Sequence, residues 1–282
     1  MQVLDNTGAL RERLLEWRRN GEQVALVPTM GNLHAGHISL VELAREHAER
    51  TVVTIFVNPT QFGENEDYDD YPRTIERDTR KLKAAGADLV FTPDVKTMYP
   101  FGVERATVVS VPHLTGDLCG ASRPGHFDGV TSVVARLFAI VQPDVAVFGQ
   151  KDFQQQLVIR FMVEDLHLPI KIVTGPIVRE PDGLAMSSRN QYLDETERAL
   201  APRLHAELEA IGQALQTGRR DYEVLQSAAT EALEHAGFRV DYVEMRRLQD
   251  LAKPDRDCDE VVVLAAVFLG AARLIDNVVV RS

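Results

Sequence analysis

A continuous apolar run followed by a glycine-rich turn is the feature that most constrains this chain. The run Val24–Val27 has the length of a buried strand, and it passes directly into a turn that contains Gly31 and Gly36. From Ile38 onward, apolar residues recur at helical spacing. A helix that begins immediately after a strand points its unpaired amide groups at the space beyond the strand end. The sequence therefore predicts an anion-binding site there.

Two histidines, His34 and His37, stand three positions apart at the start of this helix, so their rings can face the same side. Imidazole groups in that place can donate hydrogen bonds to phosphate oxygens and stabilise the charge that develops during attack on a phosphoryl group. A partly buried helix cap or part of a zinc site would give the same pair, although no third metal ligand lies nearby in the sequence. The glycines and the preceding strand favour a nucleotide.

The composition is that of an ordinary soluble protein. With 282 residues, of which 45% are hydrophobic and 26% charged, the chain has room for one large or two ordinary domains. The net charge of -11 argues against nucleic acid and an anionic membrane surface as partners. Cys119 and Cys258 form no disulfide framework, as expected for a reducing cytoplasm. We expect residues 1–19 to form an amphipathic helix, with no signal peptide or membrane span in the chain.

Strand-like and helix-like segments alternate along the first 175 residues. The expected strands are 24–27, 51–57, 87–91, 106–111, 144–148 and 168–174, and the expected helices include 73–85 and 126–141. Strand–helix–strand order implies parallel pairing with right-handed crossovers, so we predict a Rossmann-like α/β domain. Ligands of such sheets bind beyond the carboxyl ends of the strands.

Polar side chains follow the second of these strands. Asn58 and Gln61 carry uncharged amides suited to an oxygen-rich substrate, although Asn58-Pro59 is also a common turn start. Asp78 lies within the helix 73–85, where it would either face a Mg²⁺ ion or be one more solvated acid, and the residues alone favour the solvated face. The acidic segment Glu64–Asp70 is either a solvated surface or a lid that closes over the site.

The fifth strand end repeats the pattern of the first, because Gly149-Gln150-Lys151-Asp152 follows the strand 144–148 and leads into another helix. Lys151 would supply positive charge to a triphosphate, and Gln155 would present an amide one turn later. A surface lysine is the alternative. Further on, Ser187-Ser188-Arg189 follows a Pro-Asp-Gly turn and is either a phosphate clamp or a helix cap.

The character of the chain changes after residue 175. Helices are expected over 195–215 and 221–236, followed by antiparallel strands over 239–245, 260–269 and 272–280. We therefore predict two domains, a Rossmann-like domain of residues 1–175 and a smaller α+β domain of residues 176–282 that carries the clamp, with the active-site cleft between them.

Four segments together resemble a known family. His34-Ala35-Gly36-His37 matches the H-x-G-H signature of the nucleotidylyl-transfer superfamily, which includes class I aminoacyl-tRNA synthetases. The longer segments Pro28–His37, Phe56–Phe62, Gly149–Gln155 and Met186–Asn190 resemble the pantothenate synthetase (pantoate:beta-alanine ligase) family, and the resemblance covers nearly the whole chain. It implies an ATP-dependent condensation of (R)-pantoate with beta-alanine through a pantoyl adenylate, in a homodimer that uses Mg²⁺.

The resemblance also implies roles for individual residues. ATP would be bound by Met30, Gly31, Asn32, Leu33, His34, Ala35, Gly36, His37, Gly149, Gln150, Lys151, Asp152, Val178, Met186, Ser187, Ser188 and Arg189. His37 would be the proton-donating catalytic residue, assisted by His34 and Lys151. Gln61 and Gln155 would hold pantoate, with Gln61 also near beta-alanine, and Asp78 would be associated with the metal.

Two other functions fit parts of the sequence. A nucleotidylyltransferase that acts on a phosphate ester would need further Arg or Lys side chains for that phosphate, whereas Gln61 and Gln155 are uncharged. A non-catalytic nucleotide-binding module would need no acid substrate. Pyrophosphate release in the presence of single candidate acids separates the three functions.

Overall fold

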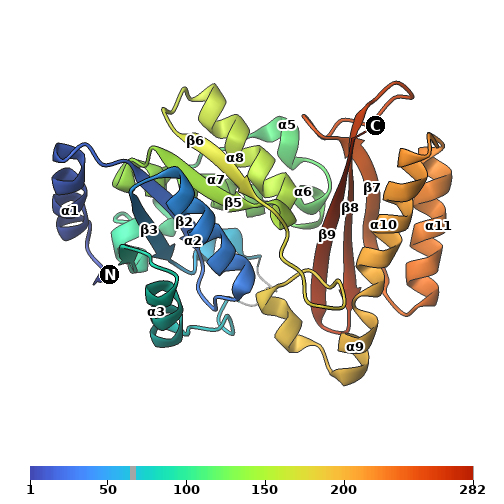
Figure 1. Cartoon of the computed structure of the whole chain (residues 1–282), viewed down its shortest axis with the longest axis horizontal. Helices are drawn as coiled ribbons and strands as arrows, with labels where there is room; N and C mark the ends of the chain where they lie inside the picture. Colours follow the sequence, from blue (N-terminus) through green and yellow to red (C-terminus); the bar gives the residue numbers. More distant parts are fainter. Residues whose placement is uncertain (64–67, 282) are drawn as a thin grey trace. The chain divides into compact units, whose positions relative to one another are not determined.

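The computed structural model describes residues 1–63 and 68–281 and divides the chain into two compact units (Figure 1). The first unit comprises Met1–Gly149 and Val158–Gly175, and the second comprises Gln150–Leu157 and Pro176–Ser282. Residues 150–157, which the sequence analysis assigned to the first domain, thus group with the second unit.

The first unit is built on a six-stranded parallel sheet of order β1-β4-β3-β2-β5-β6. Its strands are β1 Gln2–Leu4, β2 Val24–Thr29, β3 Arg50–Ile55, β4 Leu89–Phe91, β5 Val145–Gly149 and β6 Lys171–Gly175. Its longer helices are α1 Thr7–Arg19, α2 Ala35–His47, α3 Ile75–Ala84, α7 His126–Val141 and most of α8 Phe153–Asp165. The predicted Rossmann-like sheet is confirmed.

The centre of this sheet carries the first signature segment. β2 pairs with β3 along its whole length, but with β5 only at Ala25 and Leu26, so Pro28 lies beyond the β5 ladder and its missing N–H breaks no strand pairing. α2 packs across β2, β3 and β5, where Val41 and Ala44 are fully buried. β2 is therefore held along its whole length by β3 on one edge and by α2 across one face.

Two sequence-based predictions for the first unit are wrong. Residues 2–4 form the edge strand β1, paired with β4, and the helix begins only at Thr7, where the Asn6 side chain accepts a hydrogen bond from Ala9 N (2.9 Å). Residues 106–111 form no strand. Their backbone bonds to side chains of α7 instead, because Thr131 Oγ1 donates to Val109 O (2.5 Å) and Val109 N donates to Ser132 Oγ (2.9 Å).

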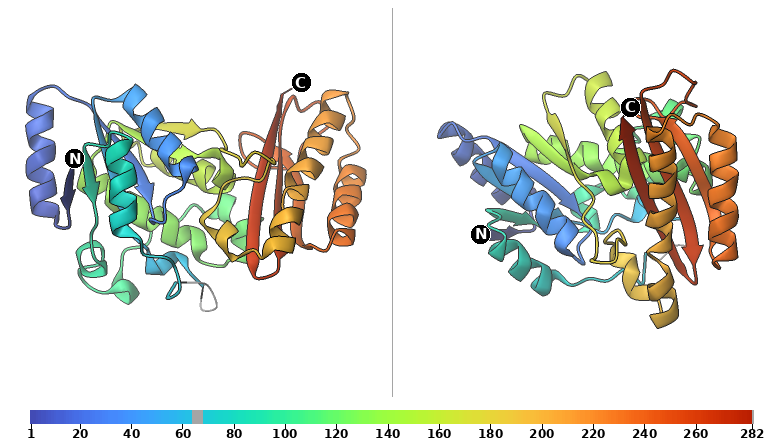
Figure 2. Two further views of the ribbon diagram at one scale, coloured as in Figure 1. Left: turned by 60° about the horizontal axis from the view of Figure 1, so that its bottom comes forward. Right: turned by 45° about the vertical axis from the view of Figure 1, so that its right-hand side comes forward.

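The second unit is the predicted smaller α+β fold. Its antiparallel sheet consists of β7 Arg239–Arg247, β8 Glu260–Leu269 and β9 Ala272–Arg281, and its helices are α9 Glu195–Leu200, α10 Arg203–Gln216 and α11 Tyr222–His235. α10 lies beside β9 and α11 beside β7 (Figure 2). The single helix expected over 195–215 is interrupted at Ala201-Pro202, because proline cannot continue the hydrogen-bond ladder of a helix. Among the described residues, no helix combines the length and apolar character that crossing a membrane requires.

Candidate active site

The turn between β2 and α2 has an unusual backbone. Gly31 (φ +84°) and Asn32 (φ +49°) are both in the left-handed region. A Cβ on Gly31 would lie 3.1 Å from Ile55 Cγ2 and 3.2 Å from Asp78 Oδ2. Position 31 therefore requires glycine both for its conformation and for the space around it.

Helix α3 holds this turn in place. Asp78 is fully buried, and its Oδ2 and Oδ1 accept hydrogen bonds from the backbone N–H groups of Asn32 (2.8 Å) and Leu33 (2.9 Å). Thr74 Oγ1 also donates to Asp78 Oδ2 (2.9 Å), and Lys81 Nζ donates to Leu33 O. A carboxylate of the protein itself thus takes up two of the amide groups that follow the strand end.

This geometry excludes the solvated-face interpretation of Asp78, because the side chain has no exposed surface. Its oxygens accept hydrogen bonds from the turn and from Thr74, which argues against a role as a magnesium ligand. Over the part of the chain that the structure describes, no group of three or more His, Cys, Asp and Glu side chains is arranged to hold a metal.

Replacing Asp78 with asparagine tests whether it binds a metal. The new NH₂ group would face a backbone N–H, so we expect a loss of about 2 kcal/mol of stability and a melting midpoint lower by about 4–8 °C. The Mg²⁺ concentration for half-maximal activity should stay within about twofold of wild type, since no metal bond is removed. Melting without Mg²⁺ or ATP measures the first effect, and Glu76→Gln, on the exposed face of the same helix, is the control. An unchanged melting midpoint with a raised Mg²⁺ requirement would restore the metal role.

The two histidines begin α2 as a reciprocal cap. His34 is the N-cap residue, and its Nδ1 accepts a hydrogen bond from Gly36 N (3.2 Å), while His37 Nδ1 accepts one from His34 N (3.3 Å). The ring centroids are 4.1 Å apart. Because both Nδ1 atoms accept, the proton of each neutral ring is on Nε2, at the side of the ring away from the cap. The same pair therefore caps the helix and presents two N–H donors.

The segment that follows β3 contacts the residue that follows β2, Met30. Gln61 Nε2 lies 3.1 Å from Met30 Sδ, and Gln61 Oε1 accepts a hydrogen bond from Asn58 Nδ2 (3.2 Å). Asn58 itself is only 1% exposed; its Nδ2 also donates to Gly129 O (3.2 Å), and its Oδ1 accepts from Tyr99 OH (2.6 Å). Asn58 therefore positions Gln61, and its expected contact with the substrate stays a prediction.

Sequence reasoning missed the side of this site that α7 provides. Arg123 Nη1 donates to His126 Nε2 (2.9 Å), so His126 donates from Nδ1 to Gln61 O (2.8 Å). A Cβ on Gly129 would lie 2.2 Å from Thr60 O, so the α7 backbone packs directly on the segment that carries Gln61. Burial raises the pKa of Tyr99 above its usual value, which keeps its phenol a donor to Asn58. The signal of this side in the sequence was a long glycine-containing connection over residues 112–125 that carries Arg123 and leads to His126, a pattern typical of either a functional loop or a surface excursion.

The remaining expected ATP contacts lie at the end of β5 and in the second unit. Gly149 ends β5; Gln150, Lys151 and Asp152 form a 3₁₀ turn; and Gln155 lies in the first turn of α8. Val178 and Met186 face each other across a hairpin, where Val178 O accepts from Met186 N (3.0 Å). Ser187 Oγ accepts a hydrogen bond from Arg189 N (3.2 Å), so Ser187 caps the 3₁₀ helix Ser188–Tyr192.

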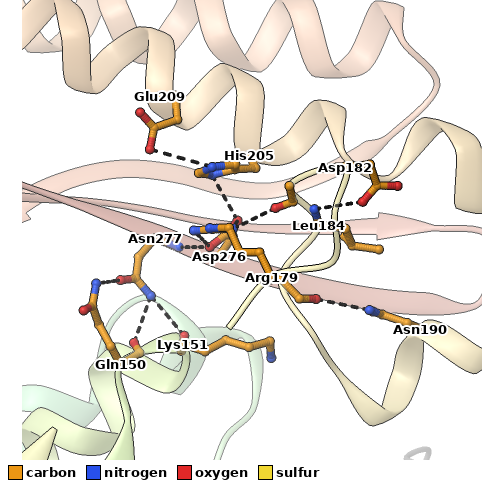
Figure 3. Close-up of polar contacts among 12 residues, drawn as sticks. Gln150, Lys151, Arg179, Asp182, Leu184, Asn190, His205, Glu209, Asp276 and Asn277 are labelled. Atoms are coloured by element: carbon orange, nitrogen blue, oxygen red, sulfur yellow. Dashed lines mark hydrogen bonds and ion pairs between the residues drawn. The ribbon is translucent and has the colours of Figure 1, made fainter. Parts of the chain in front are cut away.

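An ion pair anchors this hairpin to β9. Arg179 donates to both oxygens of Asp276 (2.6 and 3.0 Å), as Figure 3 shows. His205 of α10 lies beside the pair, with its Nδ1 3.6 Å from Asp276 Oδ2 and without a hydrogen-bond partner among the described residues. Burial, and next the nearby charge of Arg179, lowers the pKa of His205. This environment therefore favours the neutral form of the imidazole.

We expect this histidine to make folding stability depend on pH. Because its folded-state pKa is lower than the unfolded value of 6.5, the unfolded chain binds the proton more tightly. The free energy of unfolding should therefore fall as the pH drops through about 6.5 toward the folded-state pKa. Urea unfolding at pH 7.5 and 5.5 measures this loss, and His205→Asn should reduce it. If wild type and His205→Asn lost the same free energy of unfolding between pH 7.5 and 5.5, His205 would be excluded as a source of the pH dependence.

The parallel sheet and the H-x-G-H helix start define an α/β protein of the nucleotidylyl-transfer class. Residues 2–279 match the family model described as pantoate-beta-alanine ligase. The pantothenate synthetase of Thioalkalivibrio sulfidiphilus is 55% identical over 277 residues, which cover 98% of this chain and 97% of that protein. That of Halorhodospira halophila is 54% identical over 283 residues, covering 100% of this chain and 99% of that protein.

Two solved structures of pantothenate synthetases superpose on nearly the whole chain. The pantothenate synthetase of Thermus thermophilus superposes with a TM-score of 0.92 at 45% identity, covering 99% of both chains. The pantoate-beta-alanine ligase of Francisella tularensis, complexed with beta-gamma ATP and beta-alanine, has a TM-score of 0.83 at 31% identity, covering 99% of this chain and 97% of that chain. The chain belongs to the pantoate-beta-alanine ligase family and is an enzyme of the ligase class.

Proposed function

We propose that this chain joins (R)-pantoate to beta-alanine in two steps that consume one ATP. A carboxylate oxygen of pantoate attacks the α-phosphorus of ATP, the bond to the β-phosphate breaks, and pantoyl adenylate and pyrophosphate form. The amine of beta-alanine then attacks the acyl carbon, loses a proton and displaces AMP to give pantothenate. The family match over residues 2–279 is the observation that carries this proposal. The ATP and beta-alanine bound to the Francisella tularensis relative support the same ligands here.

The site residues keep the roles that their family resemblance implies. We propose that ATP is bound by Met30, Gly31, Asn32, Leu33, His34, Ala35, Gly36, His37, Gly149, Gln150, Lys151, Asp152, Val178, Met186, Ser187, Ser188 and Arg189. Gln61 and Gln155 hold pantoate through their amides, and Gln61 also serves beta-alanine.

The capping geometry supports charge stabilisation as the task of the histidines. A neutral imidazole that accepts a backbone hydrogen bond at Nδ1 offers its Nε2–H without a change of protonation. Forming an imidazolium would place a proton on Nδ1 and break the helix cap. We therefore propose that His34 and His37 donate to phosphate oxygens in the transition state, and that Lys151 adds a positive charge. The mechanism needs no covalent intermediate with the protein.

Magnesium supplies charge neutralisation when it is bound to the triphosphate. Because the hydrogen bonds of Asp78 argue against a metal ligand there, we assign the ion to ATP oxygens and route no step through Asp78. We also propose a cytoplasmic homodimer that binds neither nucleic acid nor membrane, in keeping with the net charge of -11. The segment Glu64–Asp70 stays a proposed lid, of which residues 64–67 lie outside the described residues.

Pyrophosphate release tests the function. The protein is mixed with ATP, Mg²⁺ and one candidate acid at a time, in the absence of beta-alanine. We expect release with pantoate, followed by AMP only when beta-alanine is added. Release with a phosphate ester alone would make the chain a nucleotidylyltransferase, and no release with any acid would make it a non-catalytic nucleotide-binding module.

A further inference from the structure

One buried asparagine of β9 binds the backbone around Lys151. Asn277 is 2% exposed, and its Nδ2 donates to Gln150 O (3.0 Å) and to Lys151 O (3.0 Å). Its Oδ1 accepts a hydrogen bond from Gln150 Nε2 (3.1 Å). Both ends of the Asn277 amide are thus directed at the same turn, as the close-up in Figure 3 shows.

The preceding residue of β9 binds the hairpin. Asp276 is 3% exposed and accepts two hydrogen bonds from the Arg179 guanidinium. Arg179 Nη1 also donates to Gly183 O (3.1 Å), which ties the tip of the hairpin to the same guanidinium. Asn277 N donates to Asp276 Oδ1 (2.7 Å), so the Asp276 carboxylate is also fixed to the backbone of Asn277.

β9 is a rigid base for these contacts. Asp276 and Asn277 pair with Ala265 and Leu264 in the middle of the β8–β9 ladder, and both neighbours on β8 are buried. Two consecutive residues of a paired strand therefore reach two separate segments, the turn with Lys151 and the hairpin that leads to Met186–Arg189. A polar group on a loop keeps its place far better when a buried side chain of a regular element holds the loop.

We infer that Asp276 and Asn277 are positioning residues for ATP: Asn277 fixes the backbone from which Lys151 projects, and Asp276 fixes the hairpin through Arg179. The inference rests on the proposed ATP-binding role of these two segments. Lysine has a long and flexible stem, so its ammonium group reaches a phosphate reproducibly only if its backbone is fixed. Neither residue touches the ligand in this scheme, and both act through the segments that they hold.

The affinity for a non-hydrolysable ATP analogue tests the positioning role of Asn277. We expect Asn277→Ala to raise the Kd of the whole protein, measured by calorimetry with Mg²⁺, roughly tenfold, since three hydrogen bonds to the turn are lost. Asn277→Asp keeps the shape but points a carboxylate at two carbonyl oxygens, so its Kd should rise at least as much. Asn277→Ser retains one donor and should fall between wild type and alanine. The KM for beta-alanine should change less than about threefold, because the turn contacts only the nucleotide.

Arg273→Ala is the matched control. Arg273 also lies on β9, where it donates to Asp241 Oδ2 (2.7 Å), so its removal costs an ion pair in the same sheet. Its Kd for the analogue should stay within about twofold of wild type, whatever its melting midpoint. A folded Asn277→Ala or Asn277→Ser protein with wild-type Kd would overturn the inference. A wild-type protein that fails to bind the analogue would instead refute the proposed function.

The role of Asp276 in holding the hairpin can be tested separately. Asp276→Asn removes the negative charge that Arg179 binds, so we expect faster hydrogen exchange at the Met186 amide, which bonds to Val178 O across the hairpin. We also expect weaker binding of the analogue. Unchanged hydrogen exchange at the Met186 amide, together with a wild-type Kd for the analogue, would show that Asp276 is not a positioning residue.

Discussion

A His37→Ala enzyme should release pyrophosphate about a hundred to a thousand times more slowly than wild type in a single turnover with ATP and pantoate. The lost group is the Nε2–H, a donor whose direction the helix cap fixes before the substrate binds. Such a donor acts mainly on charge that develops in the transition state, so the KM for ATP should change much less than the rate. Rapid-quench measurement of pyrophosphate gives the rate of the first step directly.

A glutamine at the same position separates the two roles of His37. His37→Gln can still accept the hydrogen bond from His34 N, because glutamine is a normal partner in a capping box, but it has no ring N–H in the place of Nε2. We expect its melting midpoint to stay near that of wild type, while its single-turnover rate remains within about tenfold of the alanine enzyme. If glutamine restored the wild-type rate, the cap alone would explain the effect of alanine.

Replacing Lys151 with alanine should lower kcat/KM for ATP about tenfold to a hundredfold, the usual cost of one hydrogen bond to a charged group. The KM for beta-alanine should stay within about threefold, because in the proposed mechanism the amine reacts only in the second step, with the adenylate. Lys253→Ala removes an exposed lysine of the same unit and should change neither constant. A larger effect on beta-alanine than on ATP would contradict the proposed phosphate role.

The sequence predicted the regular elements well wherever a buried face gave a long periodic signal. The helix over His126–Val141 and the strand β8 have the predicted bounds, and β7 and β9 extend two residues and one residue beyond the prediction. The three residues of β1 are too few to show a period. Residues 106–111 are apolar enough for a strand, but side chains of α7 satisfy their backbone, which no local pattern reveals.

For the site, sequence order indicated which loops carry polar groups but not where those groups point. Asn58 and Asp78 were singled out, yet both are buried and hold other parts of the site through hydrogen bonds. Tyr99 and Asn277 were missed because their contacts join distant positions, as with Asn277 and Gln150, which are 127 residues apart. Orientation and long-range contact are properties of the packed chain, so a motif cannot supply them.

The backbone contact at Gly129 has a consequence for the comparison of this chain with related sequences. Any side chain there would push away the Thr60 carbonyl, and with it the amides of Asn58 and Gln61. An aligned sequence with a larger residue at this position must therefore place these two amides differently, even if its H-x-G-H motif is intact. One residue in the first turn of α7 thus offers a quick check on whether a distant homologue has kept this arrangement of amides.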